Sequence, residues 1–265
     1  MIAAVATALS LLAPAPTLVA AGDIASCRST GDERTAALVA RIPGTVAILG
    51  DAVYERGTAV EFRDCYSWRR FRHRTRAALG NHEYGSPDAR PAKAYFGLPS
   101  RGYYSYELGS WHVVVLNSNC GPAGGCADGS PQQRWLEADL AGSGARCTLG
   151  YWLHPRFSSG LHGSDATMAA LWRTFARGGG DVALAGHDHH YERFAPIDGV
   201  RTFVVGTGGR SHYPVVRRPA RPRSVVADDD TYGVLRLTLR GAGYDWRFVS
   251  VPGSRFEDAG SSACT

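Results

Sequence analysis

The sequence predicts an α/β sandwich in which helices pack against mixed β-sheets. Three observations support this fold class. Apolar runs of about four to eight residues recur along the chain and end in Gly, Asp, Asn or His, as buried strands do. Stretches with helical character separate the earlier runs. The later strand-like runs follow one another without helices between them, and this combination favours a sandwich with mixed sheets.

The expected elements follow in chain order. Early strands are expected at TLVAAGD (17–23), TVAILGD (45–51), AALGNHE (77–83), TLGYWLH (148–154) and DVALAGHDH (181–189). Helices are expected at DERTAALVARI (32–42) and SPQQRWLEADLA (130–141), where Ser130 can cap the helix and Pro131 can take its first position. Later strands are expected at RTFVVGTGG (201–209), YGVLRLTLR (232–240) and YDWRFVSV (244–251), and the Arg/Pro-rich segment 217–224 is expected to be an exposed loop.

The composition is that of a globular protein that carries a positive charge. Of the 265 residues, 44% are hydrophobic and 20% are charged, and the net charge of +5 would attract an anionic substrate. The basic run from Trp68 to Arg76 favours a solvated helix face over the alternative of nucleic-acid binding, so we expect no nucleic-acid partner. The segment GTGG (206–209) lacks the Lys-Ser/Thr of a phosphate-binding P-loop and is interpreted as a turn or bulge.

The cysteine count and the first residues both favour export. Six cysteines fit three disulfides and an oxidising compartment, although 15 pairings are open. Cys120 and Cys126 suit a local clip, and Cys264 suits a tether for the chain end. Residues 1–15 resemble a secretion signal, with an N-terminal strand or a mis-set start as the alternatives. No later apolar run is long enough for a membrane span, so a secreted or periplasmic protein is expected.

Five expected strand ends carry side chains that can bind a metal ion. Because the carboxyl ends of parallel strands share one edge of a sheet, these side chains are expected to converge. Each alone is ordinary, since a single Asp before a turn is usually a cap. All five in one chain indicate a metal site. The residues are Asp23, Asp51 with Tyr54, Asn81 with His82, His154, and His187 with His189.

The segments around these residues resemble the motifs of the calcineurin-like metallophosphoesterases, and within them the purple acid phosphatase-like group. The segments are GDIA, GDAVY, GNHEY, WLHP and GHDHHYER, between residues 22 and 193. The resemblance implies a four-layer α/β/β/α sandwich with a two-metal site on the strand-end loops, in a single catalytic domain over residues 16–265. Many members have a His where this chain has Ala25, and Ala52 is a minor deviation beside Asp51. Tyr54 matches the tyrosine of the purple acid phosphatase pattern.

The resemblance also implies a ligand set. The first metal would be bound by Asp23, Asp51, Tyr54 and His189, and the second by Asp51 as a bridge, Asn81, His154 and His187. A phenolate is a hard donor, so Tyr54 favours Fe(III), with Fe, Zn or Mn as the divalent partner. His187 and His189 are two residues apart and face the same side of an extended chain, whereas His190 faces away and is expected to be a surface or supporting residue.

The function implied is hydrolysis of phosphate monoesters through attack by a metal-bound hydroxide. His82, and with it His162, would contact the phosphate and assist the leaving group. Glu83, Tyr191, Glu192 and Arg193 are expected to orient the motif loops, and His112 is expected to be structural. The substrate would be a phosphorylated small molecule or another phosphoester. The alternatives are a phosphodiesterase or nucleotide hydrolase of the same fold, and a non-catalytic secreted binding protein.

Overall fold

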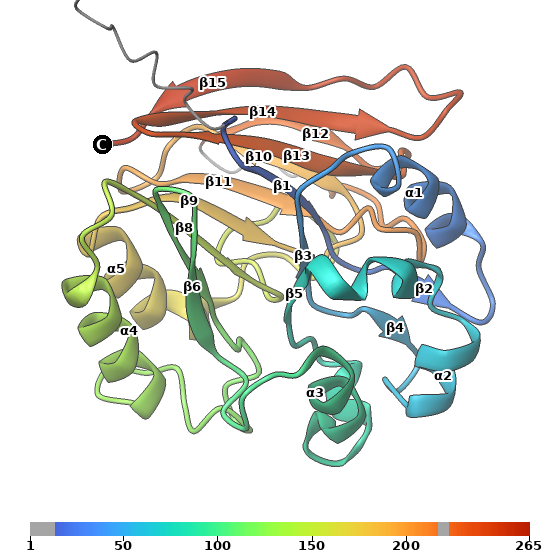
Figure 1. Cartoon of the computed structure of the whole chain (residues 1–265), viewed down its shortest axis with the longest axis horizontal. Helices are drawn as coiled ribbons and strands as arrows, with labels where there is room; N and C mark the ends of the chain where they lie inside the picture. Colours follow the sequence, from blue (N-terminus) through green and yellow to red (C-terminus); the bar gives the residue numbers. More distant parts are fainter. Residues whose placement is uncertain (1–13, 217–222) are drawn as a thin grey trace, which may run out of the picture.

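The computed structural model describes residues 14–216 and 223–265, and in these residues two β-sheets lie face to face (Figure 1). The first sheet has six strands in the order β15-β14-β13-β1-β3-β5. They are β1 (Thr17–Ala21), β3 (Thr45–Leu49), β5 (Thr75–Ala78), β13 (Gly233–Arg240), β14 (Gly243–Ser250) and β15 (Ala259–Ala263). Strands β1, β3 and β5 run parallel, and β13 joins β1 antiparallel, so the sheet is mixed.

The second sheet has seven strands in the order β12-β10-β11-β9-β8-β7-β6. They are β6 (Tyr104–Leu108), β7 (Trp111–Val115), β8 (Cys147–Trp152), β9 (Gly180–Ala185), β10 (Tyr191–Phe194), β11 (Arg201–Val205) and β12 (Ser224–Asp228). Strands β7, β8, β9 and β11 are parallel, and the outer strands are antiparallel. A separate short pair, β2 (Ala25–Ser26) and β4 (Val53–Tyr54), follows β1 and β3 in the chain.

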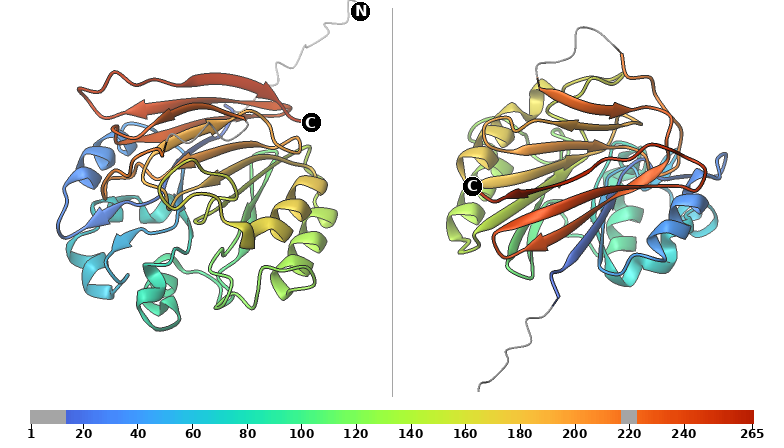
Figure 2. Two further views of the ribbon diagram at one scale, coloured as in Figure 1. Left: turned by 180° about the vertical axis from the view of Figure 1, so that it is seen from behind. Right: turned by 90° about the horizontal axis from the view of Figure 1, so that it is seen from above.

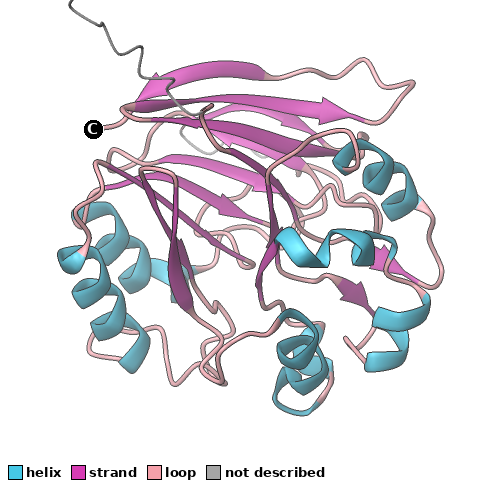
Figure 3. Cartoon of the chain, in the orientation of Figure 1, coloured by secondary structure: helices cyan, strands magenta, loops and turns pink. Residues whose placement is uncertain are grey.

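Helices cover the outer faces of the two sheets, so the layers run α/β/β/α (Figure 3). The expected four-layer sandwich with two mixed sheets is therefore confirmed. Against the first sheet pack α1 (Gly31–Val39), the 3₁₀ helix η1 (Ser67–Arg74) and α3 (Arg90–Phe96), with α2 (Ala59–Asp64) against α3. Against the second sheet packs α5 (Ala169–Arg177), with α4 (Pro131–Gly142) beside it. Three further 3₁₀ turns are η2 (Glu83–Gly85), η3 (Pro87–Ala89) and η4 (Ala166–Met168).

The main hydrophobic core lies between the sheets. Leu18 and Val46 of the first sheet and Leu149 and Leu184 of the second belong to one cluster of buried side chains. A second cluster, which includes Phe175 of α5, lies between the second sheet and its helices. Burying such side chains stabilises the fold by roughly 1.5–3 kcal/mol each. The strands β14 and β15 run along the outside of the molecule, and several of their side chains are exposed (Figure 2).

Both helices expected from the sequence are present. The expected helix 32–42 corresponds to α1, which begins one residue earlier, at Gly31, and ends at Val39. Helix α4 begins as expected, with Pro131 at its first position and Ser130 Oγ accepting a hydrogen bond from the Gln133 N–H. The basic run differs from the expected helix face, because it forms the 3₁₀ helix η1 and then enters β5. Its exposed arginines keep the expected solvated face, while Arg74 donates hydrogen bonds to the carbonyls at the end of α1.

Two expectations fall wholly or largely outside the described residues. The secretion signal predicted for residues 1–15 is one, and the exposed loop predicted for residues 217–224 is the other. Of that loop, residues 223 and 224 are described, and Ser224 already belongs to β12. Within the described ranges, no helix combines the length and the apolar character that crossing a bilayer requires.

All six cysteines form disulfides, as the even count suggested. Cys120 pairs with Cys126 in the expected local clip, and Cys27 pairs with Cys65. Cys264, expected to tether the chain end, pairs with Cys147. Cys147 is the first residue of β8 and Cys264 follows β15, so this bond connects the two sheets across 117 residues of sequence.

Replacing Cys147 and Cys264 together by Ala should lower the free energy of unfolding by about 5 kcal/mol, because a cross-link over a long loop restricts the unfolded chain most. The control is replacement of Cys120 and Cys126, which close a loop over six residues and should cost about 2 kcal/mol. Denaturant unfolding of both variants under oxidising conditions measures the difference. Equal losses in the two variants would contradict this prediction.

Candidate metal centre

The candidate ligands lie where the parallel strands of both sheets end at a common edge. Asp23 follows β1, Asp51 follows β3, His154 follows β8 and His187 follows β9, each by two residues. The backbone joins the two sheets at this edge, because Gly22 N donates to the carbonyl of Val205 at the end of β11 (2.9 Å). The prediction that these strand ends converge is therefore met by the topology.

Glycines allow the ligand loops to approach one another closely. A Cβ on Gly80 would lie 2.0 Å from Oδ1 of Asp51, and a Cβ on Gly186 would lie 2.7 Å from Oδ2 of Asp23. Both distances are too short for any side chain. Gly80 directly precedes Asn81, and Gly186 directly precedes His187. The glycine before each of these candidate ligands therefore leaves room for a neighbouring carboxylate.

Three candidate ligands have a backbone conformation that residues other than glycine rarely adopt. Asp23, Asp51 and His187 have φ angles of 58°, 48° and 72°. Such a conformation costs roughly 1–3 kcal/mol per residue and persists only where the surroundings enforce it. Here hydrogen bonds enforce it: His187 N donates to Oδ2 of Asp23 (2.7 Å), and Ile24 N donates to the Asp51 carbonyl (3.0 Å). Strain concentrated in these three loops indicates a functional site.

Four of the candidate ligands form one compact, buried group. The Tyr54 hydroxyl lies 2.7 Å from Oδ1 of Asp23, 3.1 Å from Oδ2 of Asp51 and 3.1 Å from Nε2 of His189. Nε2 of His189 lies 3.2 Å from the same oxygen of Asp23. Ligands held at about 2.0–2.2 Å from a shared ion are separated by about 3 Å from one another. The spacing of these donor atoms therefore fits a single metal ion.

The charges in this group also fit a cation. Burial, together with the charges of Glu83 and Asp23, raises the pKa of Asp51 well above its usual range. Burial and the charges of Asp23 and Asp51 raise the pKa of the Tyr54 phenol well above its usual value. A phenol beside two buried carboxylates keeps its proton unless a strong positive charge replaces it. The set of hard, anionic oxygens is the one that a highly charged ion prefers.

Histidine rings gather beside this group. The ring of His187 lies 4.5 Å from that of His154 and 4.4 Å from that of His162, measured between ring centroids. Burial lowers the pKa of His154, and burial with the charge of His154 lowers the pKa of His187 to about 4. Both shifts favour the neutral form of the ring, which is the form that metal ligation requires. Nδ1 of His154 lies 2.9 Å from the Ser118 hydroxyl, which orients the ring.

The loop after β5 brings Asn81 and His82 next to Asp51. His82 N donates to Oδ1 of Asp51 (2.9 Å), so the residue before it, Asn81, is held at the same edge, with an exposed side chain. The His82 ring lies 4.0 Å from the Tyr54 ring, and its Nδ1 donates to the Glu55 carbonyl (2.7 Å). Since a carbonyl only accepts, this bond places a proton on Nδ1 of His82.

Glu83 orients the loops as expected. Its carboxylate is buried and accepts backbone N–H groups from Asp51, Ala52 and Gly80, with a longer contact to Val53. The loops after β3 and β5 are thereby tied to one side chain. His112 of β7 is structural, also as expected, because its ring is bonded to Glu107 of β6 and to Asp139 of α4.

Two of the four residues expected to orient the motif loops have another partner. Tyr191 donates from its hydroxyl, and Arg193 from its guanidinium, to the carboxylate of Asp258 near the chain end. They fix the second sheet to the segment before β15. The expectation is wrong for these two, because their side chains point away from the loops, toward Asp258 and β14, whereas Glu192 between them does not.

Alternate residues in the segment 187–192 face a different loop. His187 and His189 point to the candidate ligands, whereas Asp188, His190 and Glu192 are fully buried on the other side. His190 is therefore a supporting residue and not a surface one. Its Nε2 lies 3.1 Å from Oε2 of Glu192, which also accepts the backbone N–H of Ser159 (2.8 Å).

Asp188 holds the loop that carries His162. Its carboxylate accepts the N–H of His162 (2.8 Å), the N–H of Gly163 (3.1 Å) and the hydroxyl of Ser158. Any Cβ on Gly160 would overlap with Asp188 and His190, so this loop and the segment 187–192 fit closely together. The alternation of side chains along an extended chain indicated that Asp188 faces away from the candidate ligands. The loop that Asp188 binds lies too far away in sequence for the same pattern to identify it.

Two more residues of the site were missed. The Tyr213 ring stacks on the His189 ring at 3.9 Å, and the Ser211 hydroxyl lies 2.8 Å from Nδ1 of His189. Both lie in the loop after β11, next to the GTGG segment, which is a loop as expected. Nothing in the spacing of this loop relative to the motifs predicted its contact with His189.

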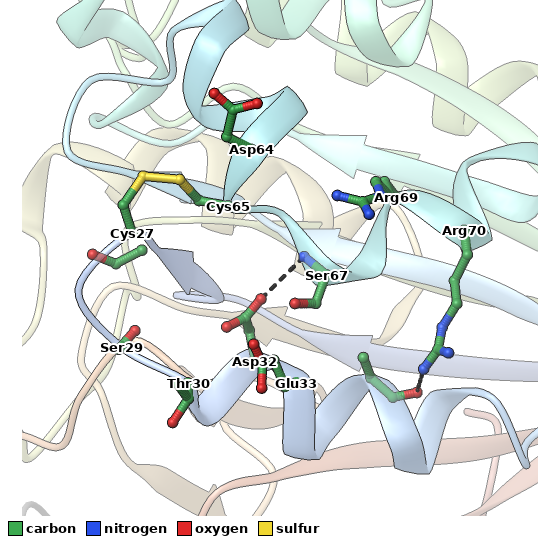
Figure 4. A pocket seen from close by; sticks show the side chains of 12 residues that line it. Cys27, Ser29, Thr30, Asp32, Glu33, Asp64, Cys65, Ser67, Arg69 and Arg70 are labelled. Atoms are coloured by element: carbon green, nitrogen blue, oxygen red, sulfur yellow. Dashed lines mark hydrogen bonds between the residues drawn. A yellow bond between two sulfur atoms is a disulfide. The ribbon is translucent and has the colours of Figure 1, made fainter.

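A cavity of about 740 Å³ lies apart from this edge, between α1 and η1 (Figure 4). The disulfide of Cys27 and Cys65 borders it, and Ser67 N donates to Oδ2 of Asp32 on its wall (3.1 Å). Its lining includes none of the candidate ligands. Cys27 of this disulfide follows β2, which pairs with β4, the strand that carries Tyr54.

Comparison with known families and sequences gives concordant matches. Residues 16–191 match the family model described as calcineurin-like phosphoesterase. A protein of Mycobacterium tuberculosis described as uncharacterized is 27% identical over 230 residues, which are 74% of this chain and 41% of that protein. Purple acid phosphatase 21 of Arabidopsis thaliana is 31% identical over 152 residues, 52% of this chain and 34% of that protein. The chain thus spans less than half the length of these relatives.

Solved structures share the fold at low identity. A purple acid phosphatase from yellow lupin seeds superposes with a TM-score of 0.78 at 18% identity, over 94% of this chain and 53% of that one. GAP50, described as the anchor in the inner membrane complex of Plasmodium, gives 0.74 at 14% identity, over 96% and 90%. A dimetal phosphatase from Danio rerio gives 0.66 at 12% identity, over 96% and 100%.

Replacing Asp188 by Asn should loosen the loop of residues 158–163 without unfolding the protein. The amide keeps the shape but loses the charge and one acceptor, and a hydrogen bond to a charged group is worth about 1.5–3 kcal/mol. The free energy of opening at His162 and Gly163 should therefore fall by about 1.4 kcal/mol or more, which accelerates their hydrogen exchange at least tenfold. Asp165→Asn removes a carboxylate from the same region and is the control. Unchanged protection in Asp188→Asn would contradict the anchoring role.

Proposed function

Because the chain belongs to the calcineurin-like phosphoesterase family, we propose that it is a binuclear-metal enzyme that hydrolyses phosphate monoesters, as a purple acid phosphatase does. The observation that carries this proposal is the buried group in which the Tyr54 hydroxyl lies within 3.1 Å of Asp23, Asp51 and His189. The likeness to purple acid phosphatases in sequence and in fold supports it.

We assign the metal ligands from the same geometry. The first ion would be bound by Asp23, Asp51, Tyr54 and His189, and the second by Asp51, Asn81, His154 and His187. The oxygen-rich first set suits Fe(III), and the neutral imidazoles and amide of the second set suit divalent Fe, Zn or Mn. When bound, the two ions would polarise the phosphoryl group and lower the pKa of water.

The side chains around the ions have separate tasks in this mechanism. His82 stands at the rim, oriented by the Glu55 carbonyl, and would donate a proton to the departing alkoxide. His162 is exposed beside His187 and would contact the phosphate, while Asp188 keeps its backbone in place. No side-chain nucleophile is required, so no covalent phosphoenzyme would form.

The fold alone does not decide between catalysis and scaffolding, since GAP50 has the same fold. We favour catalysis because the chain keeps a metal-capable side chain at every expected ligand position. We further propose that residues 16–265 form one catalytic domain, since both sheets contribute to one core. The three disulfides support a secreted or periplasmic location.

The purified protein tests the proposal directly. We expect two metal ions per chain, hydrolysis of an aryl phosphate monoester in preference to the matching diester, and a visible absorption band from a tyrosinate bound to Fe(III). Tyr54→Phe should abolish that band. Preference for the diester would indicate a phosphodiesterase, and a chain without metal or activity would indicate a binding protein. A colourless, metal-loaded, active protein would refute the iron assignment only.

His82→Ala should lower kcat by about 10²–10⁴-fold while leaving both metals bound, because loss of a general acid affects the chemical step. Asp51→Asn provides the contrast: it removes the proposed bridge and should weaken both metals together. Metal analysis and steady-state kinetics on the two variants separate the roles. An Asp51→Asn enzyme with full metal content and full activity would refute the bridging assignment.

A further inference from the structure

The backbone of Arg210 is attached to the ligand loop after β1. Arg210 lies in the loop that follows β11, and its N–H donates to the carbonyl of Asp23 (3.0 Å). Its guanidinium lies 5.1 Å above the centre of the Tyr54 ring. A cation in this position is attracted by the ring and is held at the rim of the candidate metal centre.

The guanidinium of Arg210 and His82 are connected through one residue. Nη2 of Arg210 donates to Oε1 of Glu55 (2.8 Å), and the carbonyl of the same Glu55 accepts from Nδ1 of His82 (2.7 Å). Since the His82 ring also packs against Tyr54 at 4.0 Å, these four residues form one connected group, in which Glu55 takes part through both its carboxylate and its backbone carbonyl. Arg210 therefore stands on the side of the site where His82 would meet the leaving group.

The ion pair with Glu55 leaves most of the hydrogen-bond donors of the Arg210 guanidinium unused. The bond to Glu55 is the one hydrogen bond that the Arg210 side chain makes within the described ranges, although a guanidinium has five N–H donors. The side chain of Arg210 is 25% exposed and that of Glu55 is 43% exposed. Glu55 can therefore turn into water at small cost, because an exposed ion pair contributes little. An anion from the substrate can then take its place.

We propose that Arg210 binds a second anionic group of the substrate, a carboxylate or a phosphate on the leaving group, and that Glu55 competes with it. This inference rests on the proposed phosphoesterase function. The substrate class is then a phosphoester whose leaving group carries its own negative charge. A guanidinium is well suited to both anions, because its planar fork matches two oxygens at once.

Two substrates that differ in one charge test the proposal. Phenyl phosphate and 4-carboxyphenyl phosphate have the same phosphoryl group, and the ratio of their kcat/KM values reports recognition of the carboxylate. Arg210→Gln should lower the kcat/KM for 4-carboxyphenyl phosphate, relative to that for phenyl phosphate, about fivefold or more. A loss of this size is expected for a partly exposed charge pair at moderate salt. Glu55→Gln should raise the ratio, because the competing carboxylate is gone.

Arg56→Gln is the matched control. It removes a neighbouring positive charge whose guanidinium is bonded to the Gly85 carbonyl, away from Tyr54, and should leave the ratio unchanged. If Arg210→Gln lowers kcat/KM for both substrates equally, Arg210 only supports Tyr54 and the proposal is wrong. If the ratio changes in Arg56→Gln as well, the effect is general attraction and the proposal is equally wrong.

Failure of the proposed function would be seen separately. If the metal-loaded wild-type protein hydrolyses neither substrate, the phosphoesterase assignment fails. The corresponding phosphonates, phenylphosphonate and 4-carboxyphenylphosphonate, then decide the binding question by calorimetry on the same variants. A carboxylate preference that is lost in Arg210→Gln supports the subsite, and equal affinity of the wild-type protein for the two phosphonates overturns it.

Discussion

Three acidic side chains are buried together at one edge of the sandwich, and the surrounding structure holds them there. Asp23 and Asp51 extend into the site, and Glu83 lies behind them, where burial raises its pKa to about 7 despite the backbone N–H groups that it accepts. Burial of a carboxylate is unfavourable unless it is paired, protonated or bound to a metal. The glycines that allow close approach and the strained φ angles of the ligand residues serve this one arrangement. A cation would convert the repulsion among these groups into attraction.

The segment 187–192 shows how one strand end serves two purposes. An extended chain turns successive side chains to opposite faces, so a site on one face leaves the other face free to hold a neighbouring loop. His187 and His189 face the candidate metals, while Asp188 and Glu192 bind the loop of Ser158 to Gly163. The position of His162 therefore depends on the same backbone that positions the ligands. This shared backbone couples the position of His162 to that of the candidate ligands, although His162 lies on an exposed loop.

The sequence was sufficient for the fold class, the main strands and the edge at which the site lies, because these follow from local patterns and from the shared direction of parallel strands. Motif resemblance supplied the ligand set and the family. Contacts between distant loops were not accessible in the same way. Tyr213 on His189 and Asp188 under His162 depend on how loops fold over the edge, and no periodicity encodes that. The partner of Tyr191 and Arg193 was missed for the same reason, since Asp258 lies 65 residues beyond Arg193 in sequence.

Proteins described in different terms share this fold, so any specific function must reside in side chains at its edge. The yellow lupin phosphatase and GAP50 both superpose on nearly the whole chain, although one is described as an enzyme and the other as an anchor. In this chain the first motif has Ala25 in place of a potential ligand, and under the proposed ligand set Tyr54 would supply an oxygen from the next motif. Tyr54 also contacts His82 and the Arg210 guanidinium, so the residue proposed to replace the missing ligand also borders the two side chains proposed to meet the leaving group. Under this proposal, a substitution of Tyr54 would alter metal binding and substrate recognition at the same time.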